Sequence, residues 1–499
     1  MTGEIELGAG LLSAEDFATI AAGAAVGIST EGLARMQAGH DVLTRLVAAD
    51  APIYGVTTGL GPRVVDRLDR AAQLAFPRAT VRGRAHAVGR PLPVAVIRAA
   101  LAIRAHTLLS GATGARPGLA EHIAACLNAK LTPVVGETGS IGAADLMWGG
   151  MIGLGLIGEG EMDTPNGPQP ASEALESAGL MPWEPAEREG LAFVSNSSVT
   201  GALAALGLAE LRRQFRAAQA AAALSLEGFR GNLSPIEPDL LALAPKPGQA
   251  EAASGLRTWL EGSGLFSAGA ARRLQDPLSL RNIVQIQGAV AATTTFLDAA
   301  VRDEINYPTD NPVVLIERGD VLSGGSYLSP QIAIALQAMN EALRHHAAQM
   351  TARIGKLINT RFSDLPAGLT PAGVGGAGFG AMMKSVEALF AEIAHLAQPA
   401  PIYPSPSADG VEDTITHAAI PAKALHEILR RLWSLTAMEM LAASQAIEMR
   451  GVTPAPALIK VMQMIRQCAP PLTEERSLSA EIEDLVERLT TESLTLGQD

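Results

Sequence analysis

Long alanine-rich segments are the feature that most constrains how this chain can fold. Residues 199–230 repeat Ala and Leu with little interruption, and further long segments span about 330–358, 378–397 and 418–449. Their apolar residues recur at helical spacing, and aromatic residues make up only 4% of the chain. Because small side chains let helices pack closely, we predict a mostly α-helical fold built on a bundle of long helices.

The first part of the chain predicts shorter helices separated by loops. Ser13-Ala14-Glu15-Asp16 matches the capping box that begins many helices. Apolar residues recur at helical spacing over 31–50 and again over 67–129, with breaks near 89–91 and 111–117. We expect one helix over 31–50 and further helices over 67–129, separated by the two breaks.

A change in composition near residue 198 predicts two domains. Residues 1–198 form a helical domain that carries the loops described below, and residues 199–499 form the long-helix bundle with the C-terminal helices. Within the second part, Ser329-Pro330 supplies a capping residue and a first-turn proline for the helix that follows. Strand signals are few, and we expect residues 312–316 and 321–322 to form a hairpin.

Composition and charge narrow the class of protein. Hydrophobic residues make up 48% of the chain and charged residues 18%, so we expect apolar surface to be buried between the subunits of an oligomer. The net charge of −13 argues against nucleic-acid binding, which needs clustered Lys and Arg. Cys126 and Cys468 have neither metal-ligand nor disulfide spacing. We therefore expect no metal site.

We also expect neither a signal peptide nor a membrane span. The N-terminal residues lack the basic start and apolar core of a signal peptide. No uninterrupted apolar run reaches the length that a bilayer requires. We expect a cytoplasmic protein that has no membrane partner and acts on a small molecule.

The stretch from Thr138 to Gly150 combines a turn of small residues with an apolar segment rich in glycine. Bare backbone lets other groups approach closely. One interpretation is a tight loop that feeds a packed helix, and the other is a site at which a ligand meets the backbone.

Tyr54 lies in a loop over residues 51–62 that holds three glycines and two prolines. Such a composition is typical of a mobile loop. Tyr54 is either structural or an acid/base group on a lid, and the second role requires nearby positive charge to favour the phenolate at neutral pH.

Polar residues elsewhere each allow a structural and a functional interpretation. Asn196 offers amide donors or caps a helix. Arg281 can clamp a carboxylate in bidentate fashion or pair with a neighbouring acid. Glu412 and Asp310 follow loops and suit the first turn of a helix. His86 can hydrogen-bond a heteroaromatic ring or serve a structural role.

Together and in this order, these segments resemble the aromatic amino acid lyase family, in which histidine ammonia-lyase is the nearest member. The resemblance covers most of the chain. It implies a homotetramer of the histidine ammonia-lyase and fumarase-aspartase fold type, with active sites that each draw residues from three subunits. The matching segments are Tyr54–Gly61, Arg84–Gly89, Phe193–Ser198, Gln275–Arg281, Thr309–Pro312, Ser323–Gly325 and Val411–Asp413.

The departures from the family pattern concern its electrophile. Members of the family cyclise Ala-Ser-Gly into a methylidene-imidazolone, whereas this chain has Ala143-Ala144-Asp145 in a segment one residue shorter. Ser140 matches a serine that the family has outside the triad. A second family tyrosine is Leu278 here. Because no serine can be dehydrated, we expect no such prosthetic group, and no other cofactor.

A trimethylammonium group can leave without an electrophile, because it has no N–H to lose and keeps its positive charge at every pH. The resemblance therefore points to the ergothionase class within the lineage, which eliminates trimethylamine from ergothioneine to give thiourocanate. The alternatives are a lyase for another histidine-type or aromatic amino acid or betaine, and a non-catalytic homologue that binds a ligand.

The resemblance implies a role for each candidate residue. Tyr54 removes the β-proton, Arg281 and Asn196 hold the carboxylate with Gln275 nearby, and Glu412 faces the cation or the ring. His86 suits the imidazole-type ring. Lys384 either binds the thione sulfur or is a surface lysine with a buried stem, and Trp148 is expected to face the quaternary nitrogen through a cation–π contact.

Overall fold

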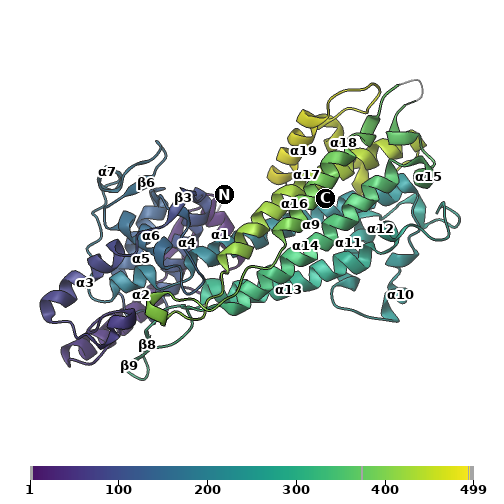
Figure 1. The fold of residues 1–499 in the computed structure, drawn as a ribbon. Helices are drawn as coiled ribbons and strands as arrows, with labels where there is room; N and C mark the ends of the chain where they lie inside the picture. The colour runs from purple at the N-terminus through teal and green to yellow at the C-terminus, as the bar shows by residue number, and fades with distance from the viewer. Residues whose placement is uncertain (1–3, 372–374, 493, 495–499) are drawn as a thin grey trace. The chain divides into compact units, whose positions relative to one another are not determined.

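The computed structural model describes residues 4–371, 375–492 and 494, and it is mostly helical, as the sequence predicts (Figure 1). The chain forms two compact units, and each is assembled from three separate stretches. Unit 1 comprises residues 1–209, 298–336 and 400–423, and unit 2 comprises residues 210–297, 337–399 and 424–499.

The predicted boundary after residue 198 therefore does not separate these units. Four of the five crossings between the units lie inside long helices, and the fifth, at residues 399–400, lies in the segment after α16 (Met383–Leu396). These helices are α9 (Ser198–Phe229), α13 (Ile283–Asn306), α14 (Pro330–Leu357) and α17 (Ala419–Arg450).

Unit 1 contains shorter helices together with parts of those four. The capping box at the first helix is present, because the Ser13 side chain accepts from the Asp16 N–H and the Asp16 carboxylate accepts from the Ser13 N–H. The shorter helices are α1 (Ala14–Ala21), α2 (Thr30–Ala48), α3 (Arg70–Arg82), α4 (Val94–Leu108), α5 (Pro117–Asn128), α6 (Leu146–Leu156), α7 (Ala171–Ser177) and α8 (Glu189–Val194), with 3-10 helices at Gly61–Val65 and Ala408–Gly410.

Four small sheets complete unit 1. The expected hairpin is confirmed as β8 (Val313–Leu315) and β9 (Asp320–Leu322), which pair antiparallel. The other sheets are made of strands too short to show an alternating pattern in the sequence. They are β1 (Ile5–Leu7) parallel to β2 (Val26–Ile28), β3 (Val88–Pro91) antiparallel to β5 (Gly136–Thr138), and the antiparallel sheet of β4 (Thr132–Pro133), β6 (Glu161–Asp163) and β7 (Gln169–Pro170).

Unit 2 is the long-helix bundle, in which parts of α9, α13, α14 and α17 run side by side (Figure 1). Helix α14 begins at Pro330 as predicted, whereas α16 is shorter than the predicted 378–397. The remaining elements are α10 (Pro238–Ala242), α11 (Gln249–Trp259), α12 (Leu278–Arg281), α15 (Thr360–Ser363), α16 (Met383–Leu396), α18 (Pro456–Cys468) and α19 (Ser479–Thr491), with 3-10 helices at Ser234–Ile236, Gly264–Phe266, Ala367–Leu369 and Gly378–Gly380.

A buried ion pair joins three helices of this bundle. Arg353 on α14 meets Glu439 on α17 through two bonds of 2.6 and 2.9 Å, and neither side chain is exposed. Ser225 on α9 donates to the same carboxylate at 2.6 Å. Such a group is tolerated in an apolar core because its hydrogen bonds are made internally.

One helical stretch is long and apolar enough to cross a membrane by length and composition, although it is not an uninterrupted apolar run. Helices α8 and α9 together span this stretch, Glu189–Phe229. However, 94% of the most apolar window is buried inside the protein. The stretch therefore has the burial of a helix in the core of a folded protein.

Helix α6 explains why the stretch from Thr138 to Gly150 is rich in glycine. It packs against α3 and α8. A β-carbon at Gly149 would lie 2.3 Å from the Phe193 carbonyl oxygen, and one at Gly150 would lie 2.4 Å from the Arg84 carbonyl oxygen. Both distances are far inside van der Waals contact, so the helix can reach its neighbours only without side chains.

Gly150→Ala should therefore destabilise the protein, by about 1–3 kcal/mol, because the added methyl group forces α6 away from the backbone at Arg84. A matched control is Gly201→Ala in α9, where the nearest atom would be 3.5 Å away. The control should unfold at or slightly above the wild-type temperature, since Ala favours a helix. Thermal unfolding measures both, and equal midpoints for the two variants would contradict a tight contact at Gly150.

Candidate active site

A cavity of about 270 Å³ in unit 1 gathers several of the predicted residues. Its walls come from the Tyr54 loop, from Ala143 and Ala144, and from the segment 408–414. Apolar side chains fill the spaces between the polar groups. The polar lining residues are Tyr54, Arg84, Ser195, Asn311, Tyr327, Glu412, Asp413 and Thr414.

The Tyr54 loop is held by bonds inside itself and by an apolar anchor. Ile53 and Val56 are buried in a cluster with Leu43 of α2. The Thr57 hydroxyl accepts from the Ile53 N–H and donates to the carbonyl of residue 51, both at 2.7 Å. The Gly61 N–H donates to the Tyr54 hydroxyl oxygen at 2.9 Å. These contacts fix both the backbone of Tyr54 and the position of its phenol oxygen.

The Ala-Ala-Asp segment, residues 143–145, forms the opposite wall and makes regular backbone bonds. The Ala144 N–H donates to the Tyr327 carbonyl at 3.0 Å, and the Asp145 N–H donates to the Asn196 carbonyl at 2.8 Å. The hydroxyl of Ser140 donates to the Ala144 carbonyl at 3.3 Å. Ala144 has φ +60°, a conformation that costs an alanine roughly 1 kcal/mol or more.

These residues do not fit the methylidene-imidazolone that the resemblance implies for the family. Residues 143 and 144 carry methyl groups, so neither has a hydroxyl to eliminate. The Asp145 N–H, which would have to attack a carbonyl carbon, is directed instead at the Asn196 carbonyl. We therefore derive no chemical step through that group.

Arg84 and Glu412 bring opposite charges to the cavity. Burial lowers the pKa of the Arg84 guanidinium, and the anionic forms of Tyr54 and Glu412 act in the opposite direction. Burial raises the pKa of Glu412, and Arg84 opposes that rise. The three groups lie close enough to influence one another's charge.

Asp310 lies at the centre of a buried ion cluster and directly precedes Asn311, a residue that lines the cavity. Arg104 donates to both of its carboxylate oxygens, at 2.8 and 2.9 Å, and Arg188 lies 3.4 Å away. Arg188 also donates to the Pro312 carbonyl at 2.9 Å. Burial alone would raise the pKa of Asp310, but the two arginines outweigh it and hold the pKa below its usual value.

Asp310 is therefore not a helix-start acid, which corrects one sequence interpretation. Helix α13 ends at Asn306 and the chain continues into β8. Glu412 does not begin a helix either, because α17 starts only at Ala419. The cluster at Asp310 fixes the adjacent Asn311, whose side chain lines the cavity.

The carboxyl groups of Asp145 and Glu304 lie near enough for the charge of Asp145 to act on Glu304. Asp145 accepts from the Thr200 N–H and hydroxyl, both at 2.8 Å, and burial raises its pKa while those bonds oppose the rise. Glu304 is partly exposed along its length, but its carboxyl group lies deep in the protein, 2.9 Å from the Ser329 hydroxyl. Burial raises the pKa of Glu304 to about 7; the Ser329 bond opposes this rise and Asp145 adds to it.

Three predicted residues of unit 1 do not line the cavity. Asn196 is buried and fully used, because its amide donates to the Ala192 and Phe193 carbonyls and its oxygen accepts from Ser198. Of the two interpretations of Asn196, these bonds match the one in which its side chain caps a helix. Trp148 is 1% exposed and donates to the Gly136 carbonyl at 2.9 Å, so the predicted cation–π role does not fit its position. His86 is exposed.

The other predicted residues belong to unit 2. Arg281 donates to the Gln275 side chain at 2.6 Å, and Gln275 is exposed. Leu278, in the position of the family's second tyrosine, is 59% exposed. Lys384 is exposed at the start of α16. None of them is among the described residues that line the cavity.

Sequence reasoning missed Arg84 and Tyr327 as lining residues. Arg84 lay inside a matching segment, but the functional role was given to His86, two residues later. Tyr327 follows Gly324 and Gly325, and a tyrosine in a glycine-rich loop was the same signal that identified Tyr54. The criterion used for Tyr54, applied to the other glycine-rich loops, would also have identified Tyr327.

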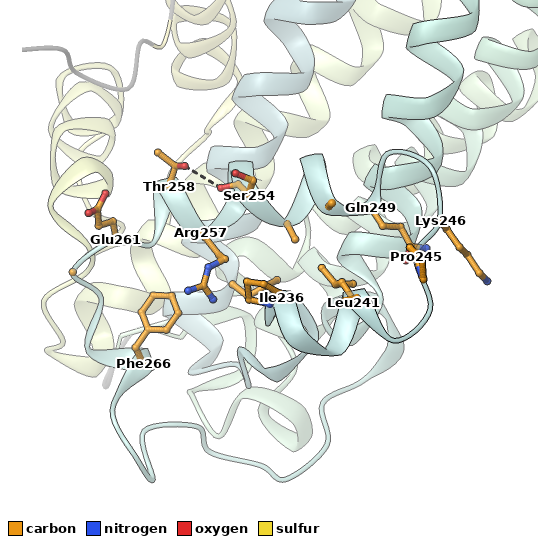
Figure 2. A pocket seen from close by; sticks show the side chains of 15 residues that line it. Ile236, Leu241, Pro245, Lys246, Gln249, Ser254, Arg257, Thr258, Glu261 and Phe266 are labelled. Atoms are coloured by element: carbon orange, nitrogen blue, oxygen red, sulfur yellow. Dashed lines mark hydrogen bonds between the residues drawn. The ribbon is translucent and has the colours of Figure 1, made fainter.

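A second cavity, of about 710 Å³, lies in unit 2 (Figure 2). Figure 2 shows the Thr258 hydroxyl bonded to the Ser254 carbonyl, at 2.9 Å. The guanidinium of Arg257 lies over the Phe266 ring at 5.4 Å and 3.4 Å from the Glu237 carboxylate. None of its described lining residues is a Tyr, His or Cys. The smaller cavity is therefore the better candidate for chemistry.

Glu304→Gln should change how stability depends on pH. The pKa of Glu304 rises from its ordinary value of 4.5 to about 7 on folding, so the folded state binds more protons between those values. Stability therefore falls as the pH rises through that window, by at most about 3.5 kcal/mol at roughly 1.4 kcal/mol per pKa unit. The variant lacks this loss, so its stability relative to the wild type should grow as the pH rises.

Chemical denaturation at several pH values measures this difference. Glu173→Gln on α7 is the control, because that carboxylate is exposed and its removal should leave the pH dependence unchanged. Parallel stability curves for the wild type and Glu304→Gln would show that Glu304 does not titrate in this window.

Known proteins are similar in sequence to this chain over almost its whole length. Histidine ammonia-lyase from Deinococcus radiodurans is 31% identical over 469 residues, covering 93% of this chain and 90% of the relative. Histidine ammonia-lyase from Symbiobacterium thermophilum is 33% identical over 485 residues, covering 97% and 96%.

Solved structures are similar over the same extent. The ergothioneine-degrading enzyme ergothionase from Treponema denticola, in complex with desmethyl-ergothioneine sulfonic acid, matches with a TM-score of 0.93 at 27% identity, covering 99% of both chains. Histidine ammonia-lyase from Trypanosoma cruzi matches with a TM-score of 0.91 at 26% identity, covering 99% of this chain and 94% of the other. The model of the family described as aromatic amino acid lyase matches residues 12–467, and this chain therefore belongs to that family.

Proposed function

We propose that this protein is a carbon–nitrogen lyase that eliminates trimethylamine from ergothioneine, the betaine of 2-thiohistidine, and releases thiourocanate. One observation carries the proposal. The cavity holds a tyrosine, an arginine and a glutamate, while its Ala-Ala-Asp wall has no hydroxyl from which to build an electrophile. The similarity to the Treponema ergothionase supports the choice of substrate.

The leaving group decides whether an electrophile is needed. A primary ammonium can lose a proton and become an amine, which is a very poor leaving group. A trimethylammonium group has no N–H, so it stays positively charged and can depart as a neutral amine. A substrate of this kind is compatible with the residues at positions 143–145.

In the proposed reaction, the Tyr54 phenolate takes a proton from the β-carbon. The electrons of that C–H bond form the Cα–Cβ double bond, and the C–N bond breaks with its electron pair on nitrogen. The products are thiourocanate, neutral trimethylamine and a protonated Tyr54. The Gly61 N–H at 2.9 Å from the phenol oxygen stabilises negative charge on that atom before the transfer.

Glu412 is proposed to face the trimethylammonium group, whose charge it offsets, or the ring. Its side chain lines the same cavity as Tyr54. The permanent charge of the substrate favours the ionised carboxylate, which burial otherwise disfavours.

Arg281, Gln275 and Lys384 are proposed to reach the site from another copy of the chain in a homotetramer. Arg281 would clamp the substrate carboxylate with Gln275 beside it, and Lys384 would contact the thione. Asn196 then shapes the site from inside, because its side chain is already used, and Trp148 has a structural role. His86 stays a proposed contact to the ring. We propose a cytoplasmic location.

A second candidate is the elimination of ammonia from histidine. The relatives at 31% and 33% identity are named histidine ammonia-lyase, which favours a histidine-type ring. The Ala-Ala-Asp segment weighs against it, because a primary amine needs help to leave. A non-catalytic homologue that only binds a ligand is the third possibility, and the assay below separates all three.

Purified protein should convert ergothioneine to a product with a long-wavelength ultraviolet band and release one trimethylamine per turnover. Tyr54→Phe should lower the rate by at least about 10²-fold with little change in the unfolding temperature, because the base is lost but the ring still packs. Tyr307→Phe is the control, since Tyr307 is 52% exposed and should be dispensable.

Two results would contradict the proposal. One is release of ammonia from histidine without any turnover of ergothioneine, and the other is near-normal turnover by Tyr54→Phe. Binding of ergothioneine without turnover would instead favour the non-catalytic homologue.

If sites are shared between subunits, two inactive variants should rescue each other. Tyr54→Phe and Arg281→Met change different units of the chain. Subunits of the two variants, mixed and reassembled, should regain up to about a quarter of wild-type activity, because some sites then combine an intact Tyr54 with an intact Arg281. Co-expression with two affinity tags isolates the hybrids. An absence of recovery in confirmed hybrids would place both residues in one subunit's site.

A further inference from the structure

Arg84 is the one positively charged side chain among the described residues that line the active-site cavity. The titratable and charged groups that share these walls with it are the phenols Tyr54 and Tyr327 and the carboxyl groups Glu412 and Asp413. Of the two carboxyl groups, Glu412 is partly buried and Asp413 is exposed. The cavity thus sets a single cation against several acidic groups.

The backbone at Arg84 is fixed by contacts on both sides. Its N–H donates to the Val81 carbonyl at 3.1 Å, and its carbonyl accepts from the His86 N–H at 3.0 Å. Helix α6 presses on the same carbonyl, and only a glycine at position 150 leaves room for it. The guanidinium therefore starts from a rigid turn, at the edge of a space of about 270 Å³.

Charge couples this guanidinium to two acidic groups in particular. Burial lowers the pKa of Arg84, and Tyr54 and Glu412 act against that effect as anions. Reciprocally, Arg84 is the one group that holds down the pKa of Glu412 against burial. Two anions in one small cavity repel each other, and a cation that lines the same cavity offsets the repulsion.

We propose that Arg84 is a positioning residue that keeps the Tyr54 phenolate and the Glu412 carboxylate ionised at the same time. This role rests on the proposed function, in which Tyr54 acts as the base and Glu412 offsets the substrate cation. Arg84 acts on both groups through its charge and does not bind the substrate carboxylate.

The role predicts the direction of each change. Without Arg84, burial acts unopposed on Glu412, so the pKa of Glu412 rises further and its carboxylate is lost at a higher pH on acidification. Tyr54 also loses the one cation among the described residues that line the cavity with it. Both effects lower the fraction of enzyme in the active charge state at neutral pH.

Arg84→Gln and Arg84→Lys test the proposal through kcat and KM measured across pH. For Arg84→Gln, kcat at neutral pH should fall about 10- to 100-fold and recover as the pH rises, while KM changes less than about threefold. The acidic limb of kcat should move to higher pH. Arg84→Lys keeps the charge and should restore most of kcat. Arg90→Gln, an exposed arginine on β3, is the control and should match the wild type.

A spectroscopic titration tests the same point without substrate. The ultraviolet tyrosinate band that is present in wild type and absent in Tyr54→Phe reports the ionisation of that one phenol. In Arg84→Gln this band should appear at higher pH than in wild type, and in Arg84→Lys at nearly the wild-type pH. If this shift occurs but ergothioneine is not converted, the charge role stands and the proposed function falls.

The opposite pattern would overturn the inference. If Arg84→Gln raises KM more than about tenfold, leaves the pH profile of kcat unchanged and leaves the tyrosinate band where it was, then Arg84 binds the substrate carboxylate directly. An unchanged tyrosinate titration in a folded Arg84→Gln protein is enough to reject the charge role.

Discussion

The buried carboxylate of Asp310 holds together the parts of unit 1 on which the cavity depends. It binds the guanidinium of Arg104 on α4 and lies beside Arg188, which precedes α8. Both arginines are nearly inaccessible, so losing the carboxylate would leave two buried cations without a counter-charge, a change that typically costs about 3–5 kcal/mol. The chain beyond Asp310 forms the β8–β9 hairpin and leads to Tyr327, whose carbonyl receives the Ala144 N–H. One ion cluster thus sets the position of two cavity walls.

The sequence predicted the long helices, the capping box at Ser13 and the β8–β9 hairpin because each leaves a local pattern. It did not predict strands of two to four residues, which are too short to show alternation, or the two units, which are made of stretches far apart in the chain. Tyr54 and Glu412 were placed in the cavity region by motif resemblance, and both line it. Trp148 was misjudged because an aromatic next to a functional segment was taken as part of the site, whereas its N–H is satisfied inside the core.

Arg84 shows why the rest of the site could not be predicted. A single arginine after a helix has no periodicity, and nothing near it in the sequence indicates that it faces a cavity. Its position follows from the glycines of α6, which lie more than sixty residues away in the chain and allow the helix to reach its backbone. The sequence shows the glycines of α6 and places Arg84 in a segment that resembles the family. Only the contact between α6 and the Arg84 backbone in three dimensions connects the two.

The interleaving of the two units has a consequence for how the protein is made. Unit 1 includes residues 400–423, so it cannot be completed until residue 423 has left the ribosome. Helices α9 and α14 wait even longer for the Glu439 carboxylate of α17, which joins Ser225 to Arg353. Slow formation of such long-range contacts leaves nascent chains prone to aggregate. Heterologous expression should therefore benefit from slower translation or from added chaperones, more than the high helical content alone would suggest.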